Sequence, residues 1–241
     1  MTSSFQRQKR LNQLRQRLGN PQDAYEVCRI YPCRHRTTAD RGQGLNRLYC
    51  RKHIEFHRRH GSYVKRSYSA AELRPHRILA QAWIADRLEQ PAVCAAVAGV
   101  RRLYGSAGAP IEAYRLTGKS PAERARVAWA YLRQREVDPL TLVSAWLAVD
   151  LCMRADPQPD WRVEYRHVQV AKLVHRMAGG THKRWERECA DGSVEVTRMD
   201  RYPVSRGRVL RIIGKQLSEV CMGLSETQPN ETGAASLTIS G

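Results

Sequence analysis

The segment DPLTLVSAWLAVDLCM, residues 138–153, indicates the fold class of the chain. Asp138 and Pro139 form a helix start, because Asp caps free backbone N–H groups and Pro is tolerated at the first helical position. From Leu140 to Met153 the residues are apolar nearly all round. A helix of this kind is buried on every side, so we predict that it is the central core helix of a mainly α protein.

Amphipathic patterns on both sides of this segment predict four more helices. SPAE at residues 120–123 is a capping box, in which a Ser and the Glu three positions later satisfy free backbone N–H groups at a helix start. Three further stretches end at typical helix stops: PHRILAQAWIADRLEQP at Pro91, AVCAAVAGVRRLYG at Gly105, and DWRVEYRHVQVAKLVHRMAGG at Gly180. The last of them is expected to bury Val163, Val170, Leu173, Val174 and Met177.

After Gly180 the sequence pattern changes from helical spacing to alternation. RWERECADGSVEVTRM, residues 184–199, alternates around Asp191-Gly192, a pair typical of a type I′ turn in a β-hairpin. A last helix is expected within residues 205–223, with Val209, Leu210, Ile213 and Leu217 buried. Its basic residues fit a helix-turn-helix in residues 200–222, but an ordinary amphipathic surface helix explains them equally well.

These patterns divide the chain into five parts. They are a basic N-terminal arm (residues 1–22), a compact basic module (23–68), a helical domain (69–178), a hairpin with a C-terminal helix (179–224) and a disordered tail (225–241). The tail has little to bury, which is typical of disorder. The central helix of the helical domain is expected to be buried within the monomer or partly across a homo-oligomer interface.

The chain has a net charge of +18, concentrated toward its N-terminus. Residues 1–77 contain 18 Lys and Arg against 5 Asp and Glu, a net charge of +13, whereas residues 78–241 contain 23 against 18, a net charge of +5. Such polarity favours a polyanionic partner. Nucleic acid is favoured over an acidic membrane, because the basic segment has no aromatic or leucine-rich face to insert. No apolar run reaches the roughly 18 to 20 residues that span a bilayer.

Seven cysteines are present without a recognisable secretory signal, so we expect a reducing cytoplasmic location, associated with the nucleoid. Cys94, Cys152, Cys189 and Cys221 are far apart, and three of these four lie in apolar helical patterns, where Cys acts as a small buried hydrophobe. Cys28, Cys33 and Cys50 are clustered. In a reducing compartment a disulfide framework is the less favoured interpretation of this cluster.

The spacing Cys28-x4-Cys33-x16-Cys50-x2-His53 predicts a structural zinc site. Two ligand pairs on short turns, joined by a loop, are what a tetrahedral Zn²⁺ requires. The connecting loop has almost no large apolar residues, so metal binding would supply folding free energy that hydrophobic burial cannot. Unconnected buried thiols and surface histidines are the alternative. His57 or His35 can also replace His53 as the fourth ligand, although His53 completes the shorter pair.

The pattern C-x4-C followed by LYCRKHIEFHRRHGS resembles the small zinc-binding modules of phage and mobile-element proteins, which often lie beside HNH-type homing endonuclease domains. The matching positions are Cys28, Cys33, Cys50, His53, Phe56, Arg58, Arg59, His60 and Gly61. The resemblance covers about 40 of the 241 residues, and the loop here is longer than usual. It implies zinc at the first four positions and nucleic-acid contact near the arginines.

Basic residues surround the expected ligands, with almost no acids among them. We expect nucleic acid to contact Arg34, Arg36, Arg47, Arg51, Lys52, His57, Arg58, Arg59, His60, Lys65 and Arg66. Such phosphate contacts supply affinity without necessarily supplying sequence choice. Tyr49, Tyr63 and Tyr68 can stack on unpaired bases, but duplex DNA is favoured over RNA. These features predict a zinc-stapled DNA-binding protein, a transcription regulator or an accessory factor of a phage or mobile element.

A metal-assisted nuclease of the HNH type, using the His-rich helix of residues 53–60, is the alternative function. Such an enzyme needs a general-base His at a strand end, an orienting Asn and metal ligands on a following helix. The sequence shows no such arrangement, and Asn46 is the only Asn in the module. We also find no P-loop and no nucleophile-elbow motif. We therefore assign no catalytic residue and expect binding rather than catalysis.

Overall fold

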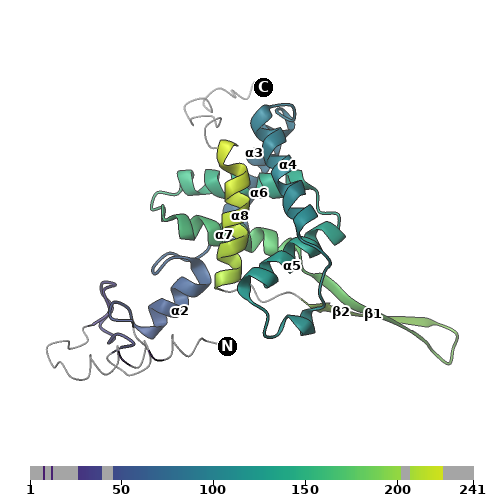
Figure 1. Ribbon diagram of the computed structural model, residues 1–241, viewed down its shortest axis with the longest axis horizontal. Helices are drawn as coiled ribbons and strands as arrows, with labels where there is room; N and C mark the ends of the chain where they lie inside the picture. The colour runs from purple at the N-terminus through teal and green to yellow at the C-terminus, as the bar shows by residue number, and fades with distance from the viewer. Residues whose placement is uncertain (1–7, 9–11, 13–26, 40–45, 202–206, 225–241) are drawn as a thin grey trace, which may run out of the picture. The chain divides into compact units, whose positions relative to one another are not determined.

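The structure, a computed structural model, describes residues 8, 12, 27–39, 46–201 and 207–224 (Figure 1). The chain divides into two compact units, residues 1–66 and residues 67–241. The first unit carries the Cys- and His-rich segment, and the second carries the long helices and the hairpin. Apart from Gln8 and Asn12, the predicted arm lies outside the described residues, as does the predicted tail of residues 225–241.

The second unit is built mainly from helices, which confirms the predicted fold class. One strand pair, β1 (Gly180–Glu188) and β2 (Val194–Arg201), accompanies them. The helices are α3 (Ala70–Ala85), α4 (Pro91–Ser106), α5 (Pro121–Gln134), α6 (Pro139–Ala155), α7 (Val163–Met177) and α8 (Arg208–Cys221), with short 3₁₀ helices η2 (Ala113–Leu116) and η3 (Met222–Leu224). In the part of the chain that the structure describes, no helix is long and apolar enough to cross a membrane.

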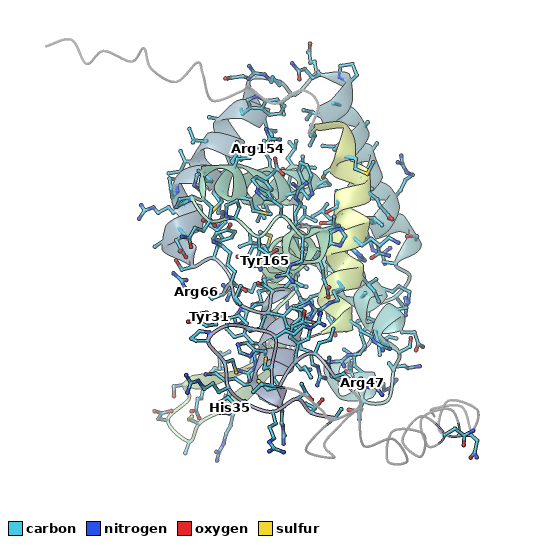
Figure 2. All side chains as sticks on the ribbon, turned by 90° about the vertical axis from the view of Figure 1, so that its left-hand side faces the viewer. Tyr31, His35, Arg47, Arg66, Arg154 and Tyr165 are labelled. Carbon is cyan, nitrogen blue, oxygen red and sulfur yellow. The ribbon has the colours of Figure 1, made fainter. Side chains whose placement is uncertain are left out.

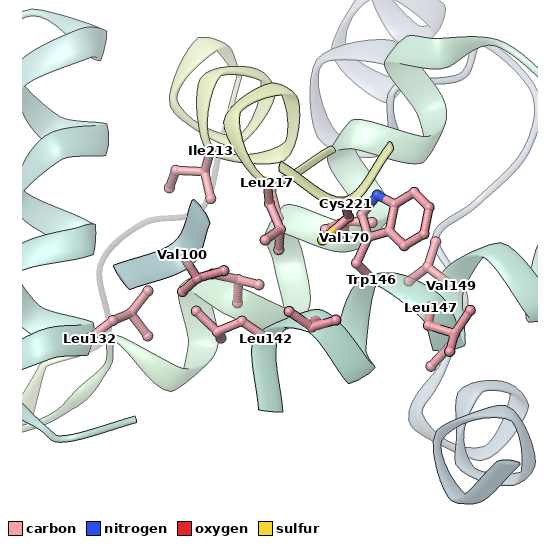
Figure 3. Packing of buried hydrophobic residues seen from close by; sticks show 14 of the residues in the cluster. Val100, Leu132, Leu142, Trp146, Leu147, Val149, Val170, Ile213, Leu217 and Cys221 are labelled. Carbon is pink, nitrogen blue, oxygen red and sulfur yellow. The ribbon is translucent and has the colours of Figure 1, made fainter. Parts of the chain in front are cut away.

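Helix α6 is the centre of this unit, as its all-round apolar sequence predicted. Residues 142–150 are all buried, and the helix packs against α3, α4, α7 and α8. Its start is capped by Asp138, whose Oδ1 accepts the Leu140 N–H at 3.1 Å. Figure 3 shows Trp146 of this helix near Cys221 of α8. Because the chain's own helices cover α6, a homo-oligomer would have to use other surfaces.

Asp150 is an acidic residue within this buried stretch. Its carboxylate is fully buried and lies 2.9 Å from Arg154 Nε and 3.0 Å from Arg166 Nη2. Taking a carboxylate out of water is costly unless opposite charges compensate for the lost hydration. The two guanidinium groups supply that compensation, and the pair with Arg166 ties α6 to α7.

Helix α8 closes the core against α4, α5 and α7. Its predicted apolar stripe is confirmed, since the buried residues include Val209, Leu210, Ile213 and Leu217. Polar side chains of the same helix accept hydrogen bonds from the N–H groups of two buried indoles. Trp129 Nε1 donates to Gln216 Oε1 at 2.8 Å, and Trp146 Nε1 donates to Ser218 Oγ at 3.1 Å. Among the described residues of the range 200–222, α8 and the short η3 follow the end of strand β2, so the first helix of a helix-turn-helix is not found there.

Capping boxes fix the starts of two helices. At α5 the Ser120 hydroxyl accepts the Glu123 N–H at 3.2 Å, and the Glu123 carboxylate accepts the Ser120 N–H at 2.9 Å, as predicted. At α3 the residues Ser69 and Glu72 make the same two bonds. Helix α3 therefore begins at Ala70, earlier than the predicted stretch, and Pro75 lies inside it. Because proline has no N–H, one carbonyl of the helix lacks its usual hydrogen-bond donor. The capping box and the packing of the helix compensate for the free-energy cost of that lost hydrogen bond.

The buried face of α7 is wider than the predicted one. Val170 and Val174 are buried as expected, but Val163, at the first position of the helix, is 66% exposed. Leu173 and Met177 are half-buried. Both still pack against the core, and the helix also buries Tyr165, Val168, Gln169, Ala171 and His175. The spacing predicted most of the core-facing side, but not how far the burial extends around the helix, which depends on the neighbours that it meets.

The cysteines of the second unit only partly follow the expectation of buried thiols. Cys152 and Cys221 are buried, as their apolar surroundings predicted. Cys94 is exposed, with its Sγ 3.3 Å from the Leu88 carbonyl, so the expectation is wrong at this position. The Ala-rich sequence around Cys94 gave no clear buried face.

The predicted hairpin is confirmed, but its turn is of another type. Strands β1 and β2 pair antiparallel and are connected by residues 189–193 (Figure 1). The Gly192 N–H donates to the Cys189 carbonyl at 3.0 Å, and in this loop only Gly192 has a positive φ, of 79°. A type I′ turn needs positive φ at both central residues. Asp191 instead accepts the Ser193 N–H on its carboxylate at 2.9 Å, which favours a right-handed backbone there.

Buried His175 gives the second unit a pH-dependent stability. The residue is 3% exposed, and burial, with the charge of Arg124 adding to it, lowers its pKa to about 4. In the unfolded chain the pKa is close to 6.5, so between about pH 6.5 and pH 4 the unfolded chain binds more protons than the folded one. We expect the free energy of unfolding to fall by about 3 kcal/mol as the pH is lowered through this window.

Urea unfolding of the helical unit at several pH values measures this effect. The variant His175→Gln keeps a hydrogen-bonding side chain and should lose this part of the pH dependence. If the free energy of unfolding changed with pH in the same way in wild type and variant, the pH dependence would come from groups other than His175.

Candidate metal centre

Four potential metal ligands come together in the first unit. Cys28 and Cys33 lie on one loop, Cys50 is the N-cap of helix α2 (Arg51–His60), and His53 lies in the first turn of that helix. Their ligand atoms, three sulfurs and one imidazole nitrogen, all lie within 4.8 Å of one another. The cysteines are free thiols. The cluster therefore has the donors and the proximity to hold a metal ion.

Backbone hydrogen bonds shape the loop that carries the first ligand pair. The Cys28 N–H donates to the His35 carbonyl at 2.8 Å and so closes the loop. Within it, the Cys33 N–H donates to the Ile30 carbonyl at 2.7 Å. This tight turn brings the two thiols to the same side, which the x4 spacing had predicted.

Asn46 organises the turn that delivers the second ligand pair. Its Oδ1 accepts the N–H groups of Leu48 and Tyr49, each at 2.9 Å. Its own N–H donates to Thr38 Oγ1 at 3.3 Å. These bonds direct the chain into Cys50, where α2 begins, and they give Asn46 a role in the fold of the module.

The distances in the cluster fit tetrahedral coordination. With metal–sulfur bonds of about 2.3 Å and metal–nitrogen bonds of about 2.0 Å, two sulfurs lie about 3.8 Å apart and a sulfur and a nitrogen about 3.5 Å apart. In the structure Cys33 Sγ and Cys50 Sγ are 3.9 Å apart. His53 Nδ1 is 3.3 Å from both Cys28 Sγ and Cys50 Sγ. A disulfide would bring two sulfurs to about 2.05 Å. The geometry suits a metal site and not a disulfide.

Protonation equilibria favour the metal-binding form at two of the ligands. Burial raises the pKa of Cys28, but the N–H groups of Cys50 and Ile30 donate to its sulfur and bring the pKa below its ordinary value. Burial lowers the pKa of His53, helped by the charge of Lys52, and favours the neutral imidazole. Burial raises the pKa of Cys50, and neighbouring thiols add to this effect. A bound cation would offset that increase, because a metal binds the thiolate.

His53, rather than His57 or His35, completes the cluster. The imidazole of His57 stacks on Tyr63, with ring centroids 4.2 Å apart and an interplanar angle of 15°. His35 is exposed on the loop after Cys33 (Figure 2). The fourth-ligand position, which sequence spacing left open, is therefore occupied by the residue of the short Cys-x2-His pair.

Aromatic side chains take the place of an aliphatic core in this module. Tyr63 stacks on Tyr49 at 3.8 Å and on His57 at 4.2 Å. In residues 27–39 and 46–66 the buried apolar side chains are Cys28, Ala39 and Cys50. Tyr68 belongs to the second unit, where its hydroxyl donates to a carboxylate at 2.6 Å. Each of these tyrosines therefore has a partner within the protein, and stacking on unpaired bases stays an alternative prediction.

Helix α2 presents a continuous basic face. At about 100° per residue, positions 51, 52, 58 and 59 fall within about 120° of arc, while positions 53, 57 and 60 fall on the opposite side. The four side chains on the basic face, Arg51, Lys52, Arg58 and Arg59, are all exposed. Glu55 is the carboxylate on this face, and it pairs with Arg51 at 3.0 Å. The metal ligand and the basic face therefore use opposite sides of one short helix.

The remaining predicted nucleic-acid contacts are spread over the same unit. His57 and His60 lie on the inner side of α2 and are half-buried. Arg29, which sequence analysis did not select, is also exposed; an isolated Arg between Cys28 and an apolar residue gives no sign of a basic cluster. The other predicted contacts lie on loops, with Lys65 half-buried and exposed side chains at Arg34, Arg36, Arg47 and Arg66 (Figure 2).

The groups that an HNH nuclease needs are not brought together among the described residues. His53 belongs to the metal cluster, His57 to the aromatic stack, and Asn46 to a turn. His167 and His175 lie on α7 in the other unit. The described part of the first unit therefore offers no general base beside an orienting Asn.

No protein-family model, curated protein or solved structure matches this chain. The resemblance to zinc-binding modules of phage and mobile-element proteins thus remains a prediction from the sequence.

Proposed function

We propose that this chain is a nucleic-acid-binding protein whose basic module is stapled by one structural Zn²⁺, with duplex DNA as the preferred partner. Its biological role on this proposal is that of a regulator or accessory factor. The observation that carries the proposal is the charge around the metal cluster. Residues 27–39 and 46–66 contain ten Lys and Arg and a single acid, Glu55. A surface of that composition gains free energy from phosphate contacts that release counterions.

Zinc is the metal that this donor set selects. Thiolate and imidazole ligands in a tetrahedral arrangement are typical of zinc, whereas Mg²⁺ and Ca²⁺ prefer oxygen ligands. The protein provides all four donors, so no coordination position is left open for a reactive water. The role of such an ion is to hold the module together.

The metal site also makes the basic face of α2 dependent on the bound ion. Cys50 and His53 fix the first turn of α2, and the basic face lies on the same helix. A ten-residue helix is marginal by itself in water. Loss of the ion would therefore unfold α2, and the basic side chains proposed to contact phosphate would no longer lie on one face.

Neutralising two cations of the basic face should weaken binding to DNA. In Lys52→Gln/Arg59→Gln we expect the slope of log K against log salt to become less steep by about 2, because each lost phosphate contact removes about one unit. Fluorescence anisotropy with a labelled duplex at several salt concentrations measures the slope. The same titrations with duplex and single-stranded RNA show which nucleic acid binds with the highest affinity.

A matched pair of arginines serves as the control. Arg101 and Arg102 are adjacent and exposed on α4 in the second unit. Arg101→Gln/Arg102→Gln removes the same charge and should leave the slope near that of the wild type. Equal losses in the two double variants would show that net charge, rather than the α2 face, drives binding.

The nuclease alternative is tested with the inner histidines of α2. If the protein only binds, His57→Ala and His60→Ala keep most of the affinity, and supercoiled plasmid remains intact with added divalent metal. Metal-dependent nicking that disappears in either variant would establish an enzyme.

A further inference from the structure

A pocket of about 330 Å³ lies within the second unit, between α3 and α7. On α7 it is lined by Gln169, Lys172 and Arg176, whose spacings of three and four residues place them on one helix face. Arg77 of α3 and Ser67, just before that helix, also line the pocket. A pocket of this size is typical of small-molecule sites.

Three cations line this pocket, and none of its lining residues is acidic. The ammonium group of Lys172 is half-buried and donates to the Ser67 hydroxyl. Burial, with the charge of Arg176 adding to it, lowers the pKa of Lys172 to about 8. An anion bound beside this ammonium group would offset both effects, because a nearby opposite charge favours the charged form of a lysine.

Apolar side chains also line the pocket. Leu73 of α3 is buried, and Leu173 and Met177 of α7 are half-buried at the pocket wall. A ligand that satisfies both parts has a compact anionic group and an apolar body beside it. Phosphate suits the charged part better than a carboxylate, because a dianion with several acceptor oxygens can pair with two guanidinium groups and one ammonium group.

We propose that this pocket binds a phosphate monoester with a small apolar body, and that Lys172, Arg176 and Arg77 hold its phosphate. The site is contained in the second unit, so it does not depend on the metal centre or on the proposed function of the first unit.

Binding of phenyl phosphate to the full-length protein tests the proposal. We expect ³¹P NMR and calorimetry to detect saturable binding at millimolar concentrations or below, tighter than that of inorganic phosphate because of the apolar wall. Lys172→Gln and Arg176→Gln should each weaken it by roughly tenfold or more, as for the loss of a charged hydrogen bond. Lys119→Gln, at an exposed position on the same unit, should retain the wild-type affinity.

Two further variants and ligands separate a specific site from general charge effects. Lys172→Arg keeps the charge and should bind within a few-fold of wild type. Since the Arg176 side chain is exposed, Arg176→Gln should fold normally even if Lys172→Gln does not, and circular dichroism verifies this. No binding of phenyl phosphate, or an equal loss in Lys119→Gln, would overturn the proposal.

A duplex oligonucleotide distinguishes the two sources of a phosphate group. If the pocket serves a small ligand, DNA binding is unchanged in Arg176→Gln, and DNA does not displace phenyl phosphate. Displacement by DNA, together with weaker DNA binding in Arg176→Gln, would assign the pocket to the nucleic-acid backbone and overturn the small-ligand proposal.

Discussion

Cys50→Ala is expected to unfold the described part of the first unit, residues 27–39 and 46–66, while the helical unit stays folded. Cys50 Sγ lies 3.3 Å from His53 Nδ1 and 3.9 Å from Cys33 Sγ, so its loss removes one of the four ligands at the start of α2. Structural zinc contributes roughly 10 to 16 kcal/mol in small modules at neutral pH. The buried apolar residues of this segment are too few to replace it.

Three measurements on the same variant check this expectation. Elemental analysis should show loss of the metal, limited proteolysis should cut within residues 27–66, and thermal unfolding of the helical unit should be unchanged. Cys94→Ala is the matched control, because Cys94 is an exposed thiol on α4, and it should change neither metal content nor proteolysis. A protease-resistant module in Cys50→Ala would mean that the metal is not what holds it together.

Gly214→Ala is expected to destabilise the helical unit by about 4 kcal/mol or more, above the usual cost of overpacking. A Cβ at Gly214 would lie 2.0 Å from the His167 carbonyl oxygen and 2.6 Å from His167 Cα. These are backbone atoms of α7, so no side-chain rotation relieves the clash. Helices α7 and α8 would have to separate, and the buried contacts of Leu210 and Leu217 would loosen.

A second helical glycine isolates the steric effect from the change in helix propensity. Around Gly105 of α4, apart from its chain neighbours and the nearby backbone of its own helix, no heavy atom lies within 4 Å of an added Cβ. Gly105→Ala should therefore stabilise the unit by about 0.5 to 1 kcal/mol, the ordinary gain from replacing a helical Gly. Urea unfolding of both variants gives the two free energies. A small cost for Gly214→Ala would mean that the α7–α8 contact is looser than the structure has it.

Local signals account for the parts of the fold that the sequence predicted correctly. The apolar run of α6 and the capping box at Ser120 depend on residues within one or two turns, and both are confirmed. The start of α3 lies before the predicted stretch, which begins at Pro75, although SAAE at residues 69–72 carries the same capping pattern as SPAE. The full width of the buried face of α7 was not predicted for a different reason, since it depends on residues that are distant in the sequence.

The candidate metal centre followed from spacing because both ligand pairs are local. The stack of Tyr49, Tyr63 and His57 did not follow from spacing. Tyr49 and Tyr63 are fourteen positions apart, and they come into contact only because α2 lies between them in the chain and brings them together. The anion pocket was not predictable either. Arg77 and Lys172 are far apart in the sequence, and only the packing of α3 near α7 brings them to one cavity.

X-ray absorption at the zinc edge of the purified full-length protein tests the central claim most directly. We predict one zinc per chain with three sulfur neighbours at about 2.3 Å and one nitrogen neighbour at about 2.0 Å, from Cys28, Cys33, Cys50 and His53. A protein that contains no zinc, or a zinc whose shell lacks three sulfurs, would contradict the account of the module.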